Sequence, residues 1–538
     1  KIKAVALQGR DSLCPQQKDD IELEKSNWSE KSKICKSLKI QTERGEIGCP
    51  FYHKILKDKN LVHKWEDEIF TAEDFSERAE EAGICPYELN KLLLKNAQVV
   101  IVPYVYFFEE FIRKHLLRKM QTSLEKTLVI VDEAHNLPDW ARNAASASMT
   151  LESVERAMHE VKKHNYVLSD NKDPRLFLEN LSSTIKFLAD EHISESEEEG
   201  LLPSQIISVD SEIPTLETEL MSRGKMTLFR LKQHSVEISK MGHNTRQLLL
   251  SEGKRPRSYL GSVGDFLFNW LESIDSHTIR LVCKKPFRLE KVCLDPRLMT
   301  KFLDKTAGVV TMSGTLTPLD MFRDLAGLRQ DSILLRNGYT FPEDNKKIFF
   351  LPDVTLKTND PEFTMVRVSH KLQTILDNFN GNIALFFKSH SDLELALENL
   401  KVKKPVYREH RGMKQELLMR VLDTFKSESG AVLAGVMGGR LAEGVDYPDS
   451  SLEMAVIVGL PYPVPKPRQK ALMHYYDVVF NGRGWQFAVI VPTVRKLLQA
   501  AGRVVRSETD RGLIIVTEKD TREISPYISS LEQSDDIV

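Results

Sequence analysis

The sequence has little of what marks membrane-bound, secreted or strongly basic proteins. No apolar run approaches the roughly 20 residues that a membrane-spanning helix needs. The formal net charge is only −2, so any contact with nucleic acid must come from a locally charged channel. No signal peptide is recognisable, and the chain begins with Lys1 instead of a methionine.

Cysteine is also scarce, with 6 in 538 residues, which is unlike a secreted disulfide framework and indicates a reducing, cytoplasmic compartment. Four of them lie in a polar region with little apolar periodicity: Cys14, Cys35, Cys49 and Cys85. Three precede a proline, which disfavours helix at the cysteine itself. A region of about seventy residues with so small a core needs a metal or a cluster to stay folded. The spacing alone leaves buried thiols, a zinc site and an iron–sulfur cluster as alternatives.

What is present is an ordinary globular composition, 41% hydrophobic and 28% charged, in a chain long enough for about three or four domains. The clearest local signal is TLVIVDEAH at Thr127–His135. Leu128–Val131 predicts a short strand buried on both faces of a parallel sheet. Asp132 and Glu133 follow at its carboxyl end, where open α/β sheets bind ligands. One carboxylate there can hold Mg²⁺, usually through water, and the next can orient a water against a phosphoryl group.

Other elements of the first half follow from the same kind of pattern. Gln98–Val102 and Val309–Met312 predict two more strands, and the second runs into Ser313-Gly314-Thr315. Small hydroxyls there bridge two sites by hydrogen bonds or cap the next helix. A 3.6-residue period over about Met149–Arg255 predicts a helical insertion with no strand pattern of its own. Two segments are expected to return toward the sheet: Phe266–Leu271 and Arg280–Leu294.

From about Asp331 a second α/β pattern runs to the end of the chain. It predicts a second parallel sheet with helices on both faces. The expected strands are Lys347–Leu351, Asn382–Phe387, Ala431–Ala434, Ala455–Gly459 and Leu513–Thr517.

Two polar stretches stand out in this second half. The first, Gly438–Asp446, joins glycines to Arg440, Glu443 and Asp446, and is either a ligand loop or a turn with an exposed ion pair. In the second, QAAGRVVR, Gln499, Arg503 and Arg506 fall at i, i+4 and i+7, on one face of a helix. They form either a clamp for a polyphosphate or a surface ion-pair helix.

In this order the DEAH, SGT, GGRLAEGVDY and QAAGRVVRS stretches resemble motifs II, III, V and VI of superfamily 2 helicases. With four cysteines before DEAH and a helical insertion after it, the chain resembles the XPD-type iron–sulfur helicases, which include DinG-like and FANCJ-like enzymes. Within that family it is most similar to the archaeal members. The resemblance covers nearly the whole chain.

The resemblance implies an α/β fold with two RecA-like parallel-sheet motor domains, the first carrying an iron–sulfur insertion and a helical Arch-like insertion. The implied boundaries are 1–13, 86–148 and 256–330 for the first motor domain, 14–85 for the cluster domain, 149–255 for the Arch-like domain and 331–538 for the second motor domain.

The resemblance also implies a role for each motif residue. Asp132 matches the Mg²⁺ holder, Glu133 the general base, and His135 the link to motif VI. Ser313 and Thr315 match the motif that couples hydrolysis to DNA movement. The remaining matches are Gln499, Arg503 and Arg506 at the γ-phosphate of ATP, Glu443 and Asp446 between nucleotide and DNA, and Cys14, Cys35, Cys49 and Cys85 as ligands of a 4Fe–4S cluster.

The implied activity is ATP-dependent 5′–3′ translocation on single-stranded DNA and unwinding of forked duplex DNA, in nucleotide excision repair, by a monomer. One departure is serious: no GxxxxGKS or GxxxxGKT phosphate-binding loop occurs in the sequence. We expect the natural protein to have this loop before the first cysteine. Two alternatives are a DNA-binding iron–sulfur fragment without ATPase activity and a redox-sensing DNA-binding protein.

Overall fold

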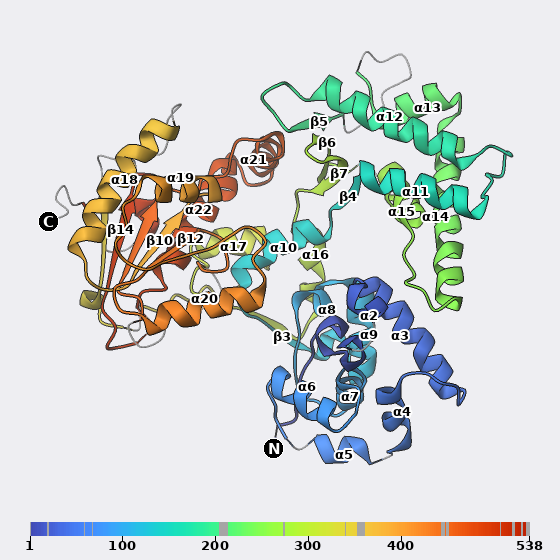
Figure 1. Ribbon diagram of the computed structural model, residues 1–538, viewed down its shortest axis with the longest axis horizontal. Coiled ribbons are helices and arrows are strands. Elements are labelled where there is room, and N and C mark those ends of the chain that lie inside the picture. The colour runs from blue at the N-terminus through green and yellow to red at the C-terminus, as the bar shows by residue number, and fades with distance from the viewer. Residues whose placement is uncertain are drawn as a thin grey trace. The chain divides into compact units, whose positions relative to one another are not determined.

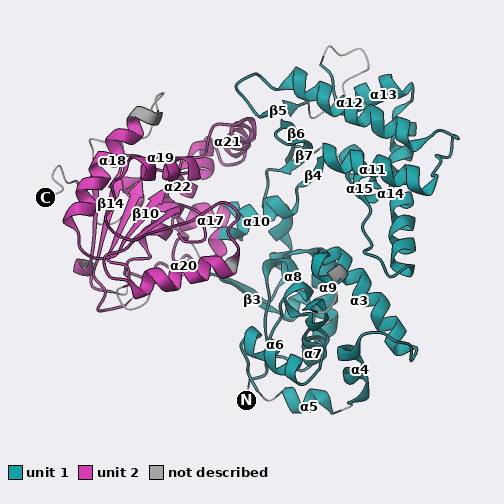
Figure 2. Ribbon diagram, in the orientation of Figure 1, with its two compact units in different colours: residues 1–132, 136–311, 325–328 teal, residues 133–135, 312–324, 329–538 magenta. Residues whose placement is uncertain are grey.

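The protein is described by a computed structural model, and its helices and strands are labelled in Figure 1. The described residues are 2–18, 21–58, 60–66, 68–203, 213–272, 275–338, 341–351, 361–442, 447, 451–505, 507–518, 522–528 and 531–533. The chain forms two compact units (Figure 2). Unit 1 holds residues 1–132, 136–311 and 325–328, and unit 2 holds residues 133–135, 312–324 and 329–538.

Unit 2 is built on one seven-stranded, fully parallel sheet of order β11-β12-β10-β13-β14-β9-β15. Its strands are β9 (Lys346–Leu351), β10 (Ile383–Phe387), β11 (Val406–Arg408), β12 (Val432–Val436), β13 (Met454–Val458), β14 (Gly512–Thr517) and β15 (Leu531–Gln533). The five predicted strands are confirmed within a residue or two. Four of them, β10, β12, β13 and β14, are apolar runs that are mostly buried, as expected where both faces of a sheet are covered, whereas β9 begins with two lysines and is only partly buried. The two missed strands, β11 and β15, are three-residue strands at the two edges.

Helices cover both faces of this sheet, as predicted (Figure 1). On one face, α18 (Pro361–Asn378) and α19 (His390–Asn399) pack against side chains such as Leu385 and Val456. On the other face, α20 (Gln415–Ser427) and α22 (Val491–Ala501) pack in a second buried cluster. The remaining helices of unit 2 are α17 (Leu319–Leu325) and α21 (Pro467–Val479), and a π-helical turn, Gln486–Ile490, leads into α22.

Unit 1 contains two short parallel strand pairs. The first joins β1 (Ala4–Ala6) to β2 (Val99–Ile101), and the second joins β3 (Leu128–Val131) to β8 (Gly308–Thr311). Strands β2, β3 and β8 were predicted and β1 was not, and the prediction that both faces of Leu128–Val131 are buried is wrong. Val129 and Val131 are buried, whereas Leu128 and Ile130 are 63% and 61% exposed. Among the described residues, each pair therefore has cover on one face only.

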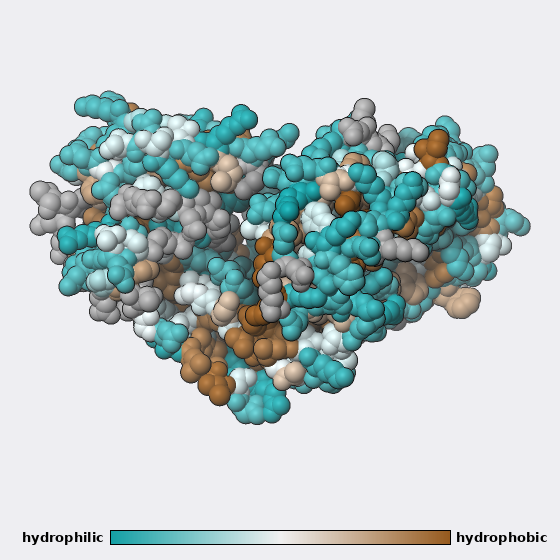
Figure 3. All heavy atoms as spheres, turned by 90° about the horizontal axis from the view of Figure 1, so that it is seen from below, coloured by the Kyte–Doolittle hydropathy of each residue, from teal (hydrophilic) through white to brown (hydrophobic). Residues whose placement is uncertain are grey.

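The uncovered sides of these pairs carry large apolar side chains at the surface. They are Val99, Ile101, Leu128, Ile130 and Val310, each at least 44% exposed. Figure 3 shows one face of the molecule, on which apolar groups in brown reach the surface among hydrophilic ones. Large exposed apolar side chains are unusual on parallel strands, whose faces are normally covered.

The cysteine-containing segment folds as a set of short helices. They are α1 (Arg10–Leu13), α2 (Ile21–Lys25), α3 (Trp28–Glu43), α4 (Pro50–Lys57), α5 (Leu61–Trp65), α6 (Ala72–Glu81) and α7 (Pro86–Leu93). Two more, α8 (Tyr104–Phe108) and α9 (Glu110–Met120), follow β2. A small aromatic cluster of Trp65, Phe70 and Phe75, with ring centroids 5.4–5.9 Å apart, lies beside β1.

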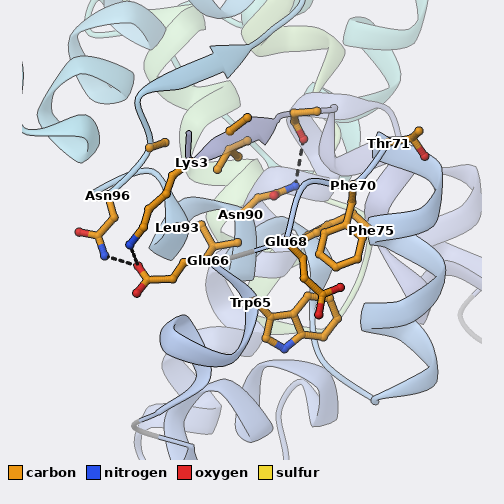
Figure 4. A pocket seen from close by; sticks show the side chains of 14 residues that line it. Lys3, Trp65, Glu66, Glu68, Phe70, Thr71, Phe75, Asn90, Leu93 and Asn96 are labelled. Carbon is orange, nitrogen blue, oxygen red and sulfur yellow. Dashed lines mark hydrogen bonds and ion pairs between the residues drawn. The ribbon is translucent and has the colours of Figure 1, made fainter. Parts of the chain in front are cut away.

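This aromatic cluster lines a small pocket in which Lys3 and Asn96 both point at the carboxylate of Glu66 (Figure 4). Lys3 Nζ lies 2.9 Å from Glu66 Oε2, and Asn96 Nδ2 lies 2.7 Å from the same oxygen. The hydrogen bond from Lys3 has the largest effect on the pKa of Glu66, followed by that from Asn96. Together they lower this pKa to about 2. The pocket thus fastens the start of β1 to the helices around it.

The predicted helical insertion contains α11 (Leu151–His164), α12 (Pro174–His192), α13 (Leu216–Gly224) and α14 (Leu228–Ser251). It is followed by α15 (Tyr259–Glu272). Two expectations fail here. β5 (Glu199–Leu202) gives the insertion a strand, and Phe266–Leu271 lies in α15, in the same core as α11 and α12 instead of returning to the parallel sheet.

The Arg280–Leu294 segment also differs from its expectation. It forms β6 (Thr278–Lys284) and β7 (Phe287–Cys293), which pair antiparallel with β5 and with β4 (Ala147–Thr150) in the order β4-β7-β6-β5. The alternation of buried and half-buried residues in β7 fits a sheet with one face on a helical core. Two further helices, α10 (Leu137–Ala144) and α16 (Arg297–Thr300), lie on either side of this sheet in the sequence. Across the described ranges, no helix combines the length and apolar character that a membrane crossing requires.

Candidate functional site

The DEAH stretch leaves β3 and enters unit 2 with Glu133. Glu133 adopts φ +44°, the left-handed region that non-glycine residues seldom occupy, and its side chain is exposed. The backbone N–H of Ala134 donates to Met312 O at 3.1 Å, which holds the turn against the segment after β8. Unusual backbone at the end of a strand is common where a side chain is aimed at a ligand.

His135 is the centre of a hydrogen-bonded group drawn from three distant stretches of the chain. It is 4% exposed, and its Nδ1 lies 2.7 Å from Ser313 Oγ and 3.2 Å from Glu133 Oε2. Its Nε2 lies 2.6 Å from Nε2 of Gln499, on α22. All four residues belong to unit 2.

The partners of the ring fix the direction of this hydrogen-bond chain. The Gln499 amide nitrogen can only donate, so His135 Nε2 accepts and the ring proton lies on Nδ1. Nδ1–H then donates to Ser313 Oγ, and the Ser313 hydroxyl is left to donate to Glu133 Oε2 at 3.0 Å. The Thr315 N–H also donates to Ser313 Oγ, at 3.2 Å. Hydrogen bonds thus connect Gln499 to the carboxylate of Glu133 through His135 and Ser313.

Sequence reasoning missed one residue of this group, Arg495. Its guanidinium donates to the carbonyls of His135, at 3.0 Å, and Thr315, at 3.3 Å. Arg495 precedes Gln499 by one helical turn on α22, so the i, i+4 spacing that selects Gln499 also selects Arg495. The i, i+4 spacing was therefore present in the sequence, but Arg495 lies before the QAAGRVVR stretch that the prediction used.

The prediction that Gln499, Arg503 and Arg506 share one helix face is wrong. α22 ends at Ala501, with Gly502 as its C-cap, because glycine is a poor helix former and a frequent helix end. Arg503 lies beyond the helix, where its Nε donates to Ala442 O at 3.0 Å. Arg506 lies outside the described residues, as do Glu443 and Asp446.

Asp132 is the last residue of unit 1 before this crossing. Its carbonyl accepts a hydrogen bond from the Tyr104 hydroxyl at 2.7 Å, and the residue is exposed. An exposed carboxylate at the end of a parallel strand is a suitable Mg²⁺ ligand, since Mg²⁺ usually keeps several waters and one or two carboxylates.

The four predicted cluster ligands line one pocket, together with Arg10 and Tyr87. They come from separate elements: Cys14 follows α1, Cys35 lies within α3, and Cys49 and Cys85 are the N-caps of α4 and α7. Proline occupies the first turn of α4 and α7, and the cysteine before it is extended and outside the helix, as the Cys-Pro pairs predicted. Phe51 and Leu38 are among the apolar walls.

Backbone N–H groups are directed at three of these sulfurs. Hydrogen bonds from Gln16 and Gln17 reach Cys14, those from Phe51 and Tyr52 reach Cys49, and that from Glu88 reaches Cys85. Burial nevertheless raises the pKa of all four thiols, and that of Cys85 to about 12. Thiols in this setting would ionise on binding a metal centre, which displaces their protons.

The donor set therefore fits a thiolate-ligated group, although the described residues hold no set of three or more His, Cys, Asp or Glu arranged for one metal ion. Arg10, which sequence reasoning also missed, interacts with the Cys35 sulfur and lies over the Tyr87 ring at 4.6 Å. A cation beside the sulfurs offsets the negative charge that four thiolates would bring.

Known protein families match most of the chain. Three family models match in succession: DEAD_2 over residues 1–154, the helical and beta-bridge domain over 151–360, and the helicase C-terminal domain over 372–533. Together these matches support an XPD-like iron–sulfur superfamily 2 helicase family for the chain. The residues around His135 come from the DEAH, SGT and QAAGRVVR stretches, which resemble motifs II, III and VI of such helicases.

Relatives and solved structures agree with this family. An ATP-dependent DNA helicase chl1 of Aspergillus clavatus is 23% identical over 96% of this chain and 77% of its own length. A regulator of telomere elongation helicase 1 homolog of Caenorhabditis elegans is 23% identical over 97% of this chain and 61% of its own length. A Fanconi anemia group J protein homolog of Gallus gallus is 23% identical over 94% of this chain and 46% of its own length. The chain therefore spans roughly half to three quarters of the length of these relatives.

Among solved structures, an XPD helicase shares the fold with a TM-score of 0.64 and 19% identity, over 99% of this chain and 87% of the other. The S. tokodaii Xpd4 structure has a TM-score of 0.54 and 20% identity, over 82% of this chain and 84% of the other. The predicted α/β class with RecA-like parallel-sheet motor domains is confirmed.

Proposed function

We propose that this chain is the motor and strand-separating part of an ATP-dependent DNA helicase that moves 5′ to 3′ along single-stranded DNA and opens forked duplexes in nucleotide excision repair. The observation that carries the proposal is the hydrogen-bond chain Gln499–His135–Ser313–Glu133. It connects the stretches that resemble motifs II, III and VI to the carboxylate of Glu133. An ATP-driven motor has to control hydrolysis at such a group. The name ATP-dependent DNA helicase carried by relatives supports the substrate class.

In this proposal Glu133 is the general base that takes a proton from the attacking water. The Ser313 hydroxyl donates to Glu133 Oε2 and so orients the carboxylate. Arg495 fixes the backbone carbonyls on both sides of this pair, so the geometry does not depend on flexible side chains alone. Arg503 and Arg506 are proposed to meet the γ-phosphate, and Glu443 and Asp446 to lie between nucleotide and DNA.

Asp132 would hold Mg²⁺, which when bound neutralises the charge of the β- and γ-phosphates. Cys14, Cys35, Cys49 and Cys85 would hold a 4Fe–4S cluster that orders the helices of the cysteine segment, whose apolar core is small. Their roles in this chain are to supply ligands from four separate elements and so to tie those elements together.

The test is ATP hydrolysis by the purified chain, with and without single-stranded DNA at one salt concentration. DNA-stimulated turnover that Glu133→Gln abolishes, with nucleotide binding retained, is the expected result. Normal turnover in that variant would remove Glu133 as the base.

A second candidate function has its own observation, since no GxxxxGKS or GxxxxGKT match occurs in the sequence. The chain would then be a DNA-binding iron–sulfur module without ATPase activity. Clear DNA binding with no turnover in the same experiment would favour this candidate over the motor.

A further inference from the structure

An open pocket on unit 2 is lined by cationic side chains that the helicase motifs do not include. It lies where the chain leaves edge strand β11 and enters α20, and its charged and polar lining is His410, Arg411, Lys414, Glu416 and Arg420. The side chains of Arg411, Lys414 and Arg420 are exposed, and no other side chain in the described part of unit 2 pairs with them. Three cations against one carboxylate leave the pocket with an excess of positive charge.

The backbone that carries these cations is held at both ends. On one side Glu409 is 7% exposed, and its N–H continues the strand ladder to Ala434 O at 2.9 Å. On the other side Met413 is 8% exposed and packs in the core cluster that contains Leu418 of α20. Because its flanks are anchored, the loop presents its cations with less loss of conformational freedom on binding.

The same loop is tied to the glycine-rich stretch of motif V. The Arg440 guanidinium donates to Met413 O, and the Glu409 carboxylate accepts from Val436 N–H at 3.4 Å. A Cβ added at Gly439 would lie 2.7 Å from Glu409 Oε2, so the Gly438–Arg440 turn rests directly on that buried carboxylate. The pocket is therefore fastened to residues just before Glu443 and Asp446.

Several features favour a strand of nucleic acid over a small anion as the occupant. The pocket is open instead of enclosed, and its cations come from two turns of chain, Arg411–Lys414 and Arg420 on α20. Lys414, the N-cap of α20, supplies no side-chain acceptor for the first N–H groups of the helix, which also attract anions. Phosphate oxygens spaced along a backbone match such a spread of donors.

We propose that Arg411, Lys414 and Arg420 form a contact site for the phosphate groups of single-stranded DNA on unit 2. The inference rests on the proposed function, because it assumes that this chain binds a DNA strand. It adds specific residues that lie outside motifs II, III, V and VI.

The experiment measures binding of a fluorescently labelled oligo-dT to the full chain by anisotropy at several salt concentrations. The test variant combines Arg411→Gln with Lys414→Gln. The matched control combines Lys401→Gln with Lys403→Gln, two exposed lysines that precede β11 in the sequence, whereas the pocket follows it. Each lost contact with single-stranded DNA should lower the slope of log K against log salt by about 0.7. We expect the test variant to lose about 1.4 in slope and the control to keep the wild-type value.

The outcomes separate this inference from the proposed function. A test variant with the wild-type slope would overturn the contact site while leaving the helicase proposal intact, and wild-type protein that binds no oligonucleotide would overturn both. Displacement of the oligonucleotide by thymidine monophosphate at equal phosphate concentration would show a small-anion site and would also overturn the inference. Equal thermal midpoints for all variants, expected for exposed side chains, exclude misfolding as the cause of a changed slope.

Discussion

The side chain of Gln499 controls more than its own contact. Its amide decides which nitrogen of His135 carries the proton, and that proton decides whether the Ser313 hydroxyl is free to donate to Glu133. The amide in the opposite orientation would accept from Nε2–H, Nδ1 would become the acceptor, and the hydroxyl would turn to the ring. At the residue scale the site thus has two possible states, one for each orientation of the Gln499 amide. In each state all the hydrogen bonds of the chain donate in the same direction.

We predict that Gln499→Leu, which keeps the bulk and removes the donor, shifts His135 toward the other ring tautomer. The loss of a hydrogen bond in a buried network costs about 1–3 kcal/mol, so DNA-stimulated hydrolysis should fall roughly 10- to 100-fold. Nitrogen-15 chemical shifts of the His135 ring measure the tautomer directly. Lys496→Leu, an exposed position on the same helix, is the control. Unchanged ring shifts in Gln499→Leu would contradict the relay.

The cysteines offer a second comparison at this scale. We predict that Cys49→Ser lowers the iron content of the purified protein and removes its brown colour, because one sulfur of the shared pocket is lost. Cys283→Ser should keep both, since Cys283 is buried in β6, outside that pocket. Elemental analysis and visible absorbance give the readout. Full iron content in Cys49→Ser would refute the ligand assignment.

At the scale of elements, how far the sequence predicts the fold depends on how local the cause is. β10 and β13 can be predicted from the sequence as unbroken apolar runs, because both of their faces are buried in the parallel sheet. β3 has the same kind of run but only one covered face, and nothing within four residues reveals that. The end of α22 at Gly502 was readable from the glycine, whereas the contact between His135 and Gln499, 364 positions apart, depends on the whole fold.

This difference gives a prediction for β3. Val129→Thr should destabilise the protein by about 1–3 kcal/mol, because its side chain is 9% exposed and the hydroxyl would be buried. Ile130→Thr, at a side chain that is 61% exposed, should change the free energy of unfolding by less than about 0.5 kcal/mol. Urea unfolding of both variants makes the comparison. Equal losses would mean that the Ile130 face is covered in solution.

For the whole molecule, the organising fact is that the units are not consecutive in sequence. Unit 2 takes residues 133–135 and 312–324 from within the span of unit 1, and these pieces carry Glu133, His135, Ser313 and Thr315. The domain boundaries implied by the family remain predictions, including those at residues 13, 85, 148, 255 and 330. The large sheet of unit 2, however, draws all its strands from residues after 345.

We therefore predict that residues 329–538 fold alone, since they contain all seven strands and the helices that cover both faces. A single cooperative thermal transition followed by far-ultraviolet circular dichroism is expected. The fragment should show no ATP hydrolysis, since it lacks Glu133 and Ser313. A fragment without a cooperative transition would show that the 133–135 and 312–324 pieces are needed for folding as well as for chemistry.

This interleaving also bears on how such a protein changes by recombination. A single crossover between two related genes cannot exchange unit 2 alone, because every junction that keeps residues 133–135, 312–324 and 329–538 from one parent also takes residues 136–311 of unit 1 from that parent. Any chimaera joined between residues 135 and 499 combines His135 from one ancestor with Gln499 from the other. The pair must therefore be inherited together or remain compatible across lineages, although the two residues are far apart in the gene.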